Sequence, residues 1–453
     1  MSFSTKYIAT VQRYVPSPFS IAIILSIIIG FAAFFWAPNP QNFGLQQRGF
    51  SIFLAWEKGF WDLLAFSMQM VLILVLGHIC ALTNAVNKLM QWLLGFFTNN
   101  ATTALGVCLI SLVFAWINWG LGLIVGAILA RKAAENARAK NIAINYPLIG
   151  AAAYTAMMVW HGGLSGSAPL TIATEHHALV DKIGVIPVSD TIFSPMNLFV
   201  SVLLLFVIPF LSYWFAKTLP TAPVHLYLSE ESDYLPESNS NAKKNTPAES
   251  LENSRWFSLS MGSVILAIGF YKAYVAGNLS VLSLNYINFM LLGLGLCLHH
   301  SVYQFLLAGE KAVKGAWGII IQFPFYAGIM GIMQYTGLIV VFSDFFVNIS
   351  NTYSFPIFTY LSAGIVNLFV PSGGGQWAVQ GPIIVNAAQL LQADLPKSVM
   401  ALAYGDQLTN MLQPFWALPL LAITGLRASD ILPYCILFFI AGFLIFFLAL
   451  LAF

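Results

Sequence analysis

The segment from Asn367 to Trp377 (NLFVPSGGGQW) interrupts a long apolar stretch and constrains the fold more than any other feature of the chain. The apolar runs on either side of it, 355–369 and 377–391, are each shorter than the ~20 residues with which a helix crosses a bilayer. A proline and consecutive glycines are poor at continuing a helix. Bare backbone at membrane depth is tolerated only where protein buries it or where it lines a wet cavity. The pattern predicts two half-helices that meet at a polar tip; a short turn outside the membrane is the alternative.

The composition places this interruption in a membrane protein. Of the 453 residues, 59% are hydrophobic and 8% are charged, and the mean hydropathy is +0.80. Such a balance is typical of an all-α polytopic membrane protein, with the lipid bilayer as its surroundings. A net charge of +2 without a basic patch or a binding motif argues against nucleic acid as a partner. The four cysteines are scattered in apolar runs without disulfide or zinc spacing, so we expect them to be small core residues.

Three further interruptions occur in apolar segments. The segment 103–134 is broken at Asn118–Gly122, the segment 147–173 at His161–Ser167, and the segment 397–424 between Asp406 and Gln413. The first of these segments is either one long tilted helix or a hairpin. Lys6 and Arg13 place the N-terminus in the cytoplasm, and a hairpin keeps the cationic segment 131–140 on that same side, so the positive-inside rule favours the hairpin.

The order of these features predicts two inverted-topology repeats, each with a re-entrant hairpin and a broken helix. We expect a first repeat over 1–216, a hydrophilic cytoplasmic linker over 217–255, and a second repeat with one extra span over 256–453. Identities between the halves are few and add little support. Inverted repeats with paired interrupted helices are typical of secondary transporters that bind their substrate near the middle of the membrane.

If the interruptions converge, they form a pocket of amides, hydroxyls and bare glycine backbone. The candidate substrate-binding residues are Asn118, Gly162, Gly163, Ser165, Ser167, Ser372, Gly373, Gly374, Gly375, Gln376, Asn410 and Gln413. None of the interruptions contains lysine or arginine, which a dicarboxylate, tricarboxylate or phosphate would usually require. The chemistry therefore favours a small monocarboxylate. Five tryptophans either wall this pocket or belong to the belts at the membrane surfaces: Trp116, Trp119, Trp160, Trp377 and Trp416.

Asp406 is the carboxylate that lies inside an interrupted apolar segment. Ionisable groups within the membrane are functional candidates, so Asp406 is expected to be a proton site or an oxygen ligand for Na⁺, unless it lies at the headgroups. We group it with Asn118, Asn367 and His161 as candidates for coupling an ion or a proton. Three roles are open for His161: it carries a proton, it donates a hydrogen bond to the substrate, or it is only hydrogen-bonded within a polar loop.

Enzyme signatures are missing from the sequence. The nearest approach to a nucleophile elbow, Gly163–Ser167, has serine where the pattern requires glycine. No phosphate-binding loop, metal-binding histidine pair or dinucleotide fingerprint is present, so we expect no enzyme, no metal beyond sodium, and no cofactor other than Na⁺ or H⁺ as a coupling ion.

The chain resembles the bacterial short-chain fatty acid transporter family, within the ion transporter superfamily. The segments that carry the resemblance are 60–66 (FWDLLAF), 117–120 (INWG), 370–375 (VPSGGG) with 380–382 (QGP), and 413–419 (QPFWALP). The resemblance implies uptake of monocarboxylates such as acetoacetate or butyrate, elevator-like motion, and a homodimer as a common assembly. Gln376 departs from the family pattern, in which histidine fits this position, so a proton role there is in doubt.

The expected function is therefore cation symport of short-chain fatty acids by alternating access in a bacterial inner membrane. A transporter of another small organic anion, a membrane-embedded enzyme, and a passive channel or sensor are the alternatives.

Overall fold

The fold is helical throughout the part of the chain that the structure describes. This structure, a computed structural model, describes residues 3–14, 16–39, 43–140, 142–175, 177, 179–221, 246–277, 281 and 283–453. Within these residues, seven helices are long and apolar enough to cross a membrane. The predicted class, an all-α polytopic membrane protein, is confirmed.

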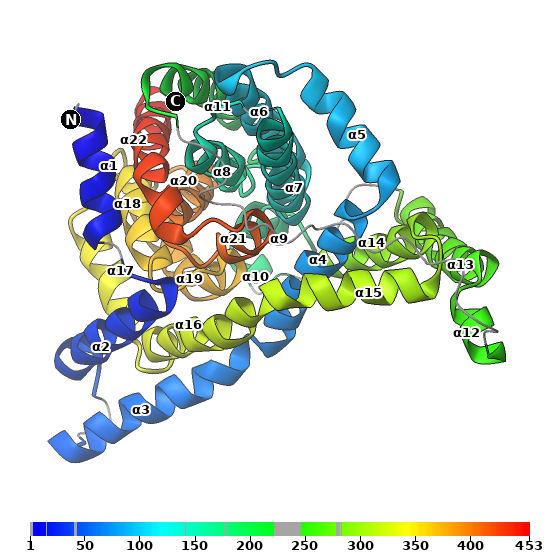
Figure 1. Ribbon diagram of the computed structural model, residues 1–453. Coiled ribbons are helices and arrows are strands. Elements are labelled where there is room, and N and C mark those ends of the chain that lie inside the picture. Colours follow the sequence, from blue (N-terminus) through cyan, green and yellow to red (C-terminus); the bar gives the residue numbers. More distant parts are fainter. Residues whose placement is uncertain are drawn as a thin grey trace.

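The first half of the chain begins with a short helix and continues with helices of very different lengths (Figure 1). Its helices are α1 (Phe3–Tyr14), α2 (Pro18–Trp36), α3 (Leu45–Asp62), α4 (Leu64–Ala81), α5 (Asn84–Gly95), α6 (Asn100–Ile117), α7 (Trp119–Ala139), α8 (Tyr146–Tyr154), a 3₁₀ turn η1 (Thr155–Met158), α9 (Ser167–Ile172), α10 (Val180–Ile183) and α11 (Pro195–Thr218).

The second half contains the remaining helices. They are α12 (Pro247–Glu252), α13 (Arg255–Ala276), α14 (Leu284–Leu298), α15 (Val302–Val313), η4 (Lys314–Ala316), α16 (Trp317–Tyr335), α17 (Leu338–Asn348), α18 (Phe355–Asn367), α19 (Gly373–Leu391), α20 (Leu395–Thr409), η5 (Asn410–Leu412), α21 (Leu418–Thr424) and α22 (Ala428–Ala452). Of the predicted linker 217–255, residues 222–245 lie outside the described residues, and Pro247–Glu252 is helical.

The segment 103–134 folds as a hairpin. The chain reverses at Asn118, whose side-chain oxygen accepts a hydrogen bond from Leu121 N and so caps α7. Small residues let the two helices approach closely: a methyl group at Gly122 would come within 2.5 Å of Ala115 Cα, and one at Gly126 within 2.4 Å of Ser111 Oγ. The prediction of a hairpin rather than one long helix is therefore confirmed.

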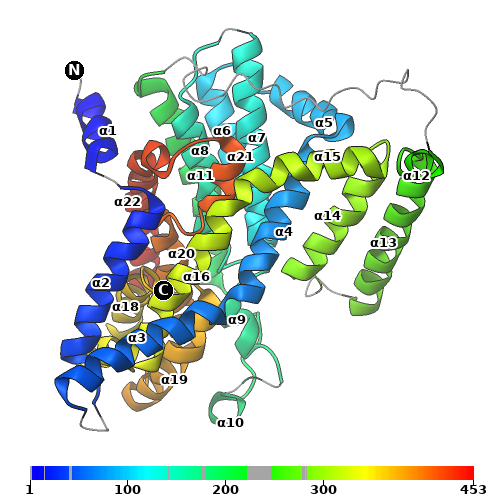
Figure 2. The ribbon, with the colours of Figure 1, turned by 60° about the horizontal axis from the view of Figure 1, so that its bottom comes forward.

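The two broken segments form the centre of the molecule. All nine residues of α8 are buried, and so are residues 398–410 of α20 and η5. In Figure 1, α8 and α20 lie in the middle of the bundle, whereas α13 and α14 lie at its edge in both Figure 1 and Figure 2. An apolar surrounding makes any polar group here costly unless it is hydrogen-bonded or charge-compensated.

A second close contact joins α3 to α16, which cross in Figure 2. At the crossing, a methyl group on Gly59 would come within 2.4 Å of Gly331 Cα, and one on Gly331 would come within 2.5 Å of Ala55 O. Glycine is needed at both positions because no other residue lets two helix backbones approach so closely.

One local expectation is wrong. Gly373, Gly374 and Gly375 do not form bare loop backbone but are the first residues of α19, which begins four residues earlier than the apolar run at Trp377 suggests. Glycine is costly in the middle of a helix but less so in its first turn, where Ser372 caps the helix by accepting a hydrogen bond from Gly375 N. The non-helical tip of the hairpin is therefore Leu368–Ser372.

Candidate functional site

The tip of the α18–α19 hairpin is fastened to the second broken segment by Asn367. Its amide nitrogen donates to Asp406 O at 2.7 Å, to Thr409 Oγ1 at 3.0 Å and to Asn410 Oδ1 at 2.8 Å. Gln413 Nε2 completes the contact by donating to Asn367 O at 3.2 Å. Asn367 is fully buried, so these hydrogen bonds replace the water that its amide would otherwise bind.

The tip of the α6–α7 hairpin is fastened to the first broken segment in a comparable way. Trp119 N donates to Ser165 Oγ at 3.0 Å, and Leu164 N donates to Trp116 O at 2.8 Å. A methyl group at Gly163 would come within 2.2 Å of Trp116 O, so glycine is required for this approach. Each hairpin tip thus lies against one broken segment.

Hydrogen bonds then join the two broken segments to each other. Gln407 Oε1 accepts from the backbone nitrogens of His161 at 2.9 Å and Gly162 at 3.3 Å. The hydroxyl of Tyr154 donates to Asn410 O at 2.8 Å. The structure therefore brings all four interruptions, including Asn118, Ser165, Asn410 and Gln413, into one buried polar centre.

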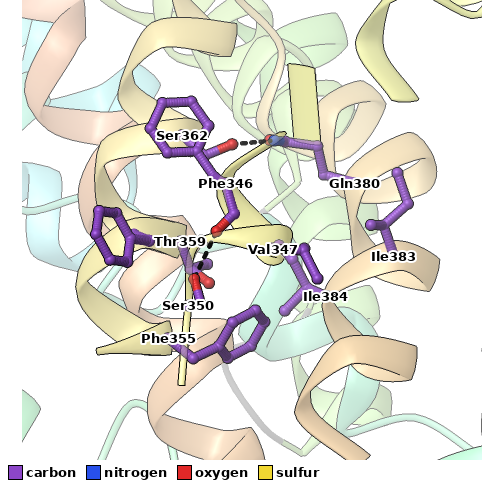
Figure 3. Close-up of a pocket in the computed structure, with 10 residues that line it drawn as sticks. Phe346, Val347, Ser350, Phe355, Thr359, Ser362, Gln380, Ile383 and Ile384 are labelled. Atoms are coloured by element: carbon purple, nitrogen blue, oxygen red, sulfur yellow. Dashed lines mark hydrogen bonds between the residues drawn. The ribbon is translucent and has the colours of Figure 1, made fainter. Parts of the chain in front are cut away.

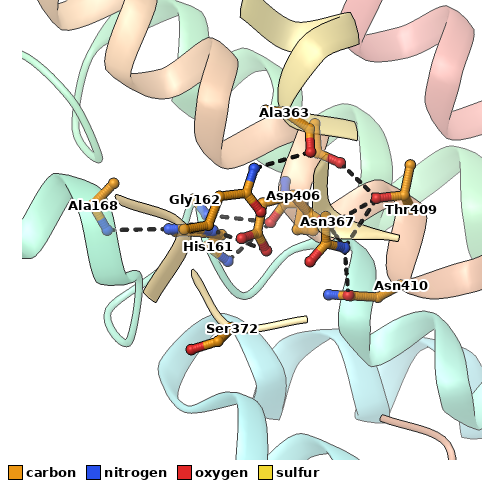
Figure 4. A network of polar contacts seen from close by, with 12 residues as sticks. His161, Gly162, Ala168, Ala363, Asn367, Ser372, Asp406, Thr409 and Asn410 are labelled. Atoms are coloured by element: carbon orange, nitrogen blue, oxygen red, sulfur yellow. Dashed lines mark hydrogen bonds and ion pairs between the residues drawn. The ribbon is translucent and has the colours of Figure 1, made fainter. Parts of the chain in front are cut away.

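His161 and Asp406 face each other in this centre. The side chain of His161 is 0% exposed and that of Asp406 is 1% exposed, and His161 Nδ1 lies 3.4 Å from Asp406 Oδ1. This separation exceeds the ~2.7–2.9 Å of a charge-assisted hydrogen bond, and neither carboxylate oxygen has a hydrogen-bond partner in the part of the chain that the structure describes. Figure 4 shows Asp406 between His161 and Asn367. The burial places Asp406 inside the protein and not on its outer surface.

The first turn of α19 lies beside His161. A methyl group at Gly373 would come within 3.0 Å of His161 Cε1 and 3.1 Å of Ser167 Oγ, whereas one at Gly374 would meet nothing within 4 Å. The backbone nitrogens of Gly373 and Gly374 belong to the turn whose N–H groups have no partner within the helix. Together with the helix dipole, they favour a negatively charged group at this end of α19.

Gln376 lies away from this turn. Its amide nitrogen donates to Ala363 O at 2.9 Å and to Gln380 Oε1 at 2.8 Å, between α18 and α19. Gln380 in turn donates to Ser362 Oγ at 3.2 Å, on the wall of a small and mostly apolar pocket between α17, α18 and α19 (Figure 3). Because the lining of this pocket contains neither His161 nor Asp406, we do not assign the substrate to it.

Three of the five tryptophans gather beside the centre. Trp160 stacks on His161 with 4.4 Å between ring centroids, and Trp416 lies 4.8 Å from Trp119. Trp119 and Trp160 are 6.3 Å apart. Trp377, in contrast, packs in a separate apolar cluster of α9, α18, α19 and α20. The cluster of Trp119, Trp160 and Trp416 can offer an apolar surface next to a polar centre.

Sequence reasoning missed Asn197. This residue lies near the start of α11, a continuous and mostly apolar helix. Its amide nitrogen donates to Gly162 O at 2.8 Å and its oxygen accepts from Tyr404 Oη at 3.0 Å, so it holds both broken segments. The one available signal is an isolated amide within an apolar helix, which is often present to hydrogen-bond across helices.

The fold and the centre define a class: a polytopic helical membrane protein whose hairpins and broken helices meet at a buried polar site. The family described as "Short chain fatty acid transporter" matches the chain over residues 1–453. The chain belongs to this family and is a membrane transporter.

Two relatives support this assignment. A protein of Escherichia coli (strain K12) is 39% identical over 437 residues, which cover 96% of this chain and 94% of that protein. A protein of Haemophilus influenzae (strain ATCC 51907 / DSM 11121 / KW20 / Rd) is 35% identical over 433 residues, covering 94% of this chain and 93% of its own length. Both are named for short-chain fatty acid transport.

A solved structure is also similar over most of the chain. The crystal structure of the YdaH transporter from Alcanivorax borkumensis, described as having an unusual topology, aligns with a TM-score of 0.41 and 14% identity, covering 96% of this chain and 97% of that one.

Proposed function

We propose that this protein takes up short-chain monocarboxylates, such as butyrate or acetoacetate, together with a cation by alternating access. The observation that carries the proposal is the buried carboxylate of Asp406, which faces His161 in a centre whose four interruptions contain no lysine or arginine. His161 in turn lies beside the first turn of α19. The family assignment and the names of the relatives support the substrate class.

The carboxylate of the substrate is proposed to bind at the first turn of α19. Gly373 and Gly374 offer backbone N–H groups, and Ser167 and Ser372 offer hydroxyls close by. Such a site holds one negative charge without a lysine or arginine. The short apolar tail would then contact the surface of Trp119, Trp160 and Trp416.

A cation completes the charge balance. A substrate carboxylate and an ionised Asp406 within one buried centre repel each other, and burial makes either charge costly unless it is compensated. Na⁺ or H⁺ bound with Asp406 removes this cost. Candidate oxygen ligands are the side chains of Asn367, which contacts the backbone of Asp406, and of Gln413, which contacts Asn367. Their Oδ1 and Oε1 atoms are buried and have no hydrogen-bond partner among the described residues.

Translocation is proposed to occur in a bacterial inner membrane, with the N-terminus in the cytoplasm and with a homodimer as the candidate assembly. In this proposal the two hairpins have opposite orientations in the membrane, because the halves of the chain are inverted relative to each other. Their movement carries the centre from one face of the membrane to the other.

The experiment is accumulation of labelled butyrate in proteoliposomes, with an inward Na⁺ gradient or an inward proton gradient imposed in turn. We expect one gradient to drive accumulation above that in empty liposomes. Excess unlabelled acetoacetate should compete with butyrate, whereas succinate should not, because a second carboxylate finds no lysine or arginine in the interruptions. Competition by succinate would shift the substrate class to dicarboxylates. If butyrate inside the liposomes never exceeds its outside concentration under either gradient, the protein is a passive channel.

Two variants test the position of the site. Ser372→Ala removes the cap of α19 and a hydroxyl, and Asp406→Asn removes the charge while preserving the shape of the side chain. If both variants fold and both accumulate butyrate like the wild type, this assignment of the site is wrong.

The alternative of a membrane-embedded enzyme finds little support in the geometry. Ser165 Oγ accepts a hydrogen bond from Trp119 N, while the ring nitrogens of His161 face Asp406 and Ala168. A serine nucleophile needs its base within hydrogen-bond reach, and these two side chains are directed to different partners.

A further inference from the structure

Several helix ends meet at one end of the molecule, around Asn145 just before α8. The backbone nitrogen of Asn145 donates to Asn100 Oδ1 at 2.8 Å, at the start of α6. Its amide nitrogen donates to Pro220 O, just after α11, and to Tyr434 Oη on α22, each at 3.0 Å. These contacts hold the end of α11 and the starts of α6, α8 and α22 together.

The helices α1, α5 and α15 belong to the same end. A methyl group at Gly315, where α15 continues through η4, would come within 3.0 Å of Ala422 Cβ on α21. The end of α21 contacts α8 in turn, since Tyr146 Oη donates to Thr424 O at 2.7 Å. Helix α1 packs on α22, and α5 packs on α7. In Figure 2, α1, α5 and α15 lie in the upper part of the molecule, whereas α10 lies at its lower edge.

Exposed lysines gather at this end, which we call the cationic end: α1, α5, the end of α7, α15 with η4, and the helix ends around Asn145. Four of these lysines are exposed and form no ion pair with a described residue. They are Lys6 on α1, Lys88 on α5, Lys140 just after α7 and Lys314 in η4. Ammonium groups that protein carboxylates leave uncompensated can attract anions from outside the protein.

Acidic side chains do not balance the charge of the cationic end. Glu135 and Asp430 are already paired with neighbouring basic side chains, at 2.9 and 3.0 Å. Glu310 on α15 and two glutamates of α12 are the other described acidic residues nearby. At the lower edge of Figure 2, in contrast, the loop around α10 carries three acidic residues and Lys182. The two ends of the molecule therefore differ in the sign of their charge.

Helix α5 has the pattern of a helix that lies along a membrane surface. One of its faces is buried against the protein. A second face is apolar and exposed, with Leu89, Trp92 and Phe96 at 51%, 62% and 64% exposure. Lys88 and Gln91 lie on a third face, which is polar and exposed. Exposed apolar and cationic faces on one helix favour the boundary between lipid headgroups and acyl chains.

The junction of α15 with α16 shows the same combination. Lys314 is exposed in η4, and the exposed apolar side chains nearest to it in sequence are Val313 and Trp317, at 48% and 66% exposure. Tryptophan is typical of the headgroup level of a membrane, and the stem of a lysine can cover apolar surface while its ammonium group reaches the headgroups. An anionic group that binds here meets an apolar surface as well as a positive charge.

We propose that the cationic end binds the headgroups of anionic phospholipids, with α5 and α15 lying along the membrane surface. A soluble anion would compensate the lysines but would leave Leu89, Trp92 and Trp317 exposed to water, whereas a phospholipid covers both kinds of surface. The inference depends on neither the substrate nor the coupling ion. Because α1 belongs to this end, it agrees with the proposed cytoplasmic N-terminus, since anionic lipids make the cytoplasmic surface of a membrane negative.

The experiment measures which lipids contact the protein. Wild-type protein is reconstituted in phosphatidylcholine, and electron paramagnetic resonance compares spin-labelled phosphatidylglycerol with spin-labelled phosphatidylcholine at the protein surface. We expect the protein to prefer phosphatidylglycerol, and high salt to weaken this preference. The double variant Lys88→Gln with Lys314→Gln should lower the preference by about twofold or more, averaged over all lipids in contact with the protein.

Two double variants serve as controls. Lys88→Arg with Lys314→Arg keeps both charges and should keep the preference. Lys182→Gln with Lys272→Gln removes two exposed lysines from α10 and α13 and should keep it too. The proposal would be overturned by a wild type without the preference, by a Lys88→Gln and Lys314→Gln variant that retains it, or by its loss in either control. Loss of the preference on adding inorganic phosphate would also overturn it, in favour of a soluble anion.

A second measurement tests how α5 lies. Spin labels are attached to Leu89→Cys or to Lys88→Cys, each with Cys297→Ser because Cys297 is partly exposed. The label at position 89 should collide mainly with oxygen, which concentrates in the bilayer, and the label at position 88 mainly with a water-soluble nickel complex. Equal access of nickel to both positions would place α5 away from the membrane surface and contradict the proposal.

Discussion

At the scale of single residues, Asn367 joins the tip of α18 to the second broken segment. Asn367→Ala removes the amide nitrogen that shares its two hydrogens among three acceptors, and leaves Asn410 Oδ1 and Thr409 Oγ1 with fewer donors in a buried place. We expect the free energy of unfolding to fall by about 1–3 kcal/mol, because unpaired buried polar groups pay a desolvation cost. Thermal unfolding of the purified protein, followed by intrinsic fluorescence, measures the change.

An exposed amide provides the matched control for this variant. Asn386 on α19 is exposed and its oxygen accepts from Lys182 Nζ, so Asn386→Ala should change the stability by no more than about 0.5 kcal/mol. Equal effects of the two substitutions would mean that Asn367 contributes nothing beyond an ordinary surface contact.

Individual residues differ in how far sequence predicts them. Asp406 and His161 can be chosen because an ionisable group inside an apolar segment is rare and costly. The role of Gln376 is harder to predict. Its neighbours in sequence form the tip of the hairpin, but its side chain is hydrogen-bonded to Gln380 on the next turn of α19. Asn197 escapes notice since its role depends on segments about 35 and 207 residues away in the chain.

At the scale of helices, the crossing of α3 and α16 depends on Gly59 and Gly331. Gly331→Ala places a methyl group within 2.5 Å of the backbone of α3, so the helices must separate. Overpacking of this kind is expected to cost about 1–3 kcal/mol and to lower the Tm. Gly30→Ala is the control, because α2 leaves open space at that position. Equal Tm values for the two variants would contradict the close contact.

Gly374, the exposed residue in the first turn of α19, makes a prediction about access. Gly374→Cys has room for its side chain, and we expect an impermeant thiol reagent to modify it from one side of the membrane. Saturating butyrate should slow this modification, by about tenfold at a concentration ten times its Kd if binding excludes the reagent.

Native cysteines should react little with the thiol reagent. Three native cysteines are buried, and Cys297 is partly exposed and can be replaced by serine. Ser189→Cys, in an exposed loop before α11, serves as the control whose modification should not respond to butyrate. If butyrate leaves modification of Gly374→Cys unchanged, the substrate does not bind at this turn.

The breaks in helices can be predicted from sequence, but their exact ends cannot. Pro371, Gly162 and Gly163 predict breaks because their backbone preferences oppose a regular helix within an apolar run. The start of α19 at Gly373 is not predictable from propensity, since it depends on the cap that Ser372 provides to the first turn. The number and order of the four interruptions do not by themselves predict that they meet. That prediction also requires the two halves to fold around one common site.

At the scale of the whole molecule, the described helices account for a membrane transporter with its polar groups gathered at the centre. The family match covers the whole chain, and the apolar surroundings of α8 and α20 isolate the centre from lipid. The inverted relation of the halves, the domain boundaries at 216 and 255, and the orientation in the membrane remain predictions.

The central claim, that substrate and cation bind together at this buried centre, is tested most directly by equilibrium binding. The measurement is the Kd of purified wild-type protein for butyrate, with Na⁺ exchanged for choline at constant pH and then with pH varied without Na⁺. Coupled binding is reciprocal, so one cation should tighten butyrate binding by about tenfold or more, and Asp406→Asn should remove this dependence. A Kd that is the same under all these conditions would contradict the account.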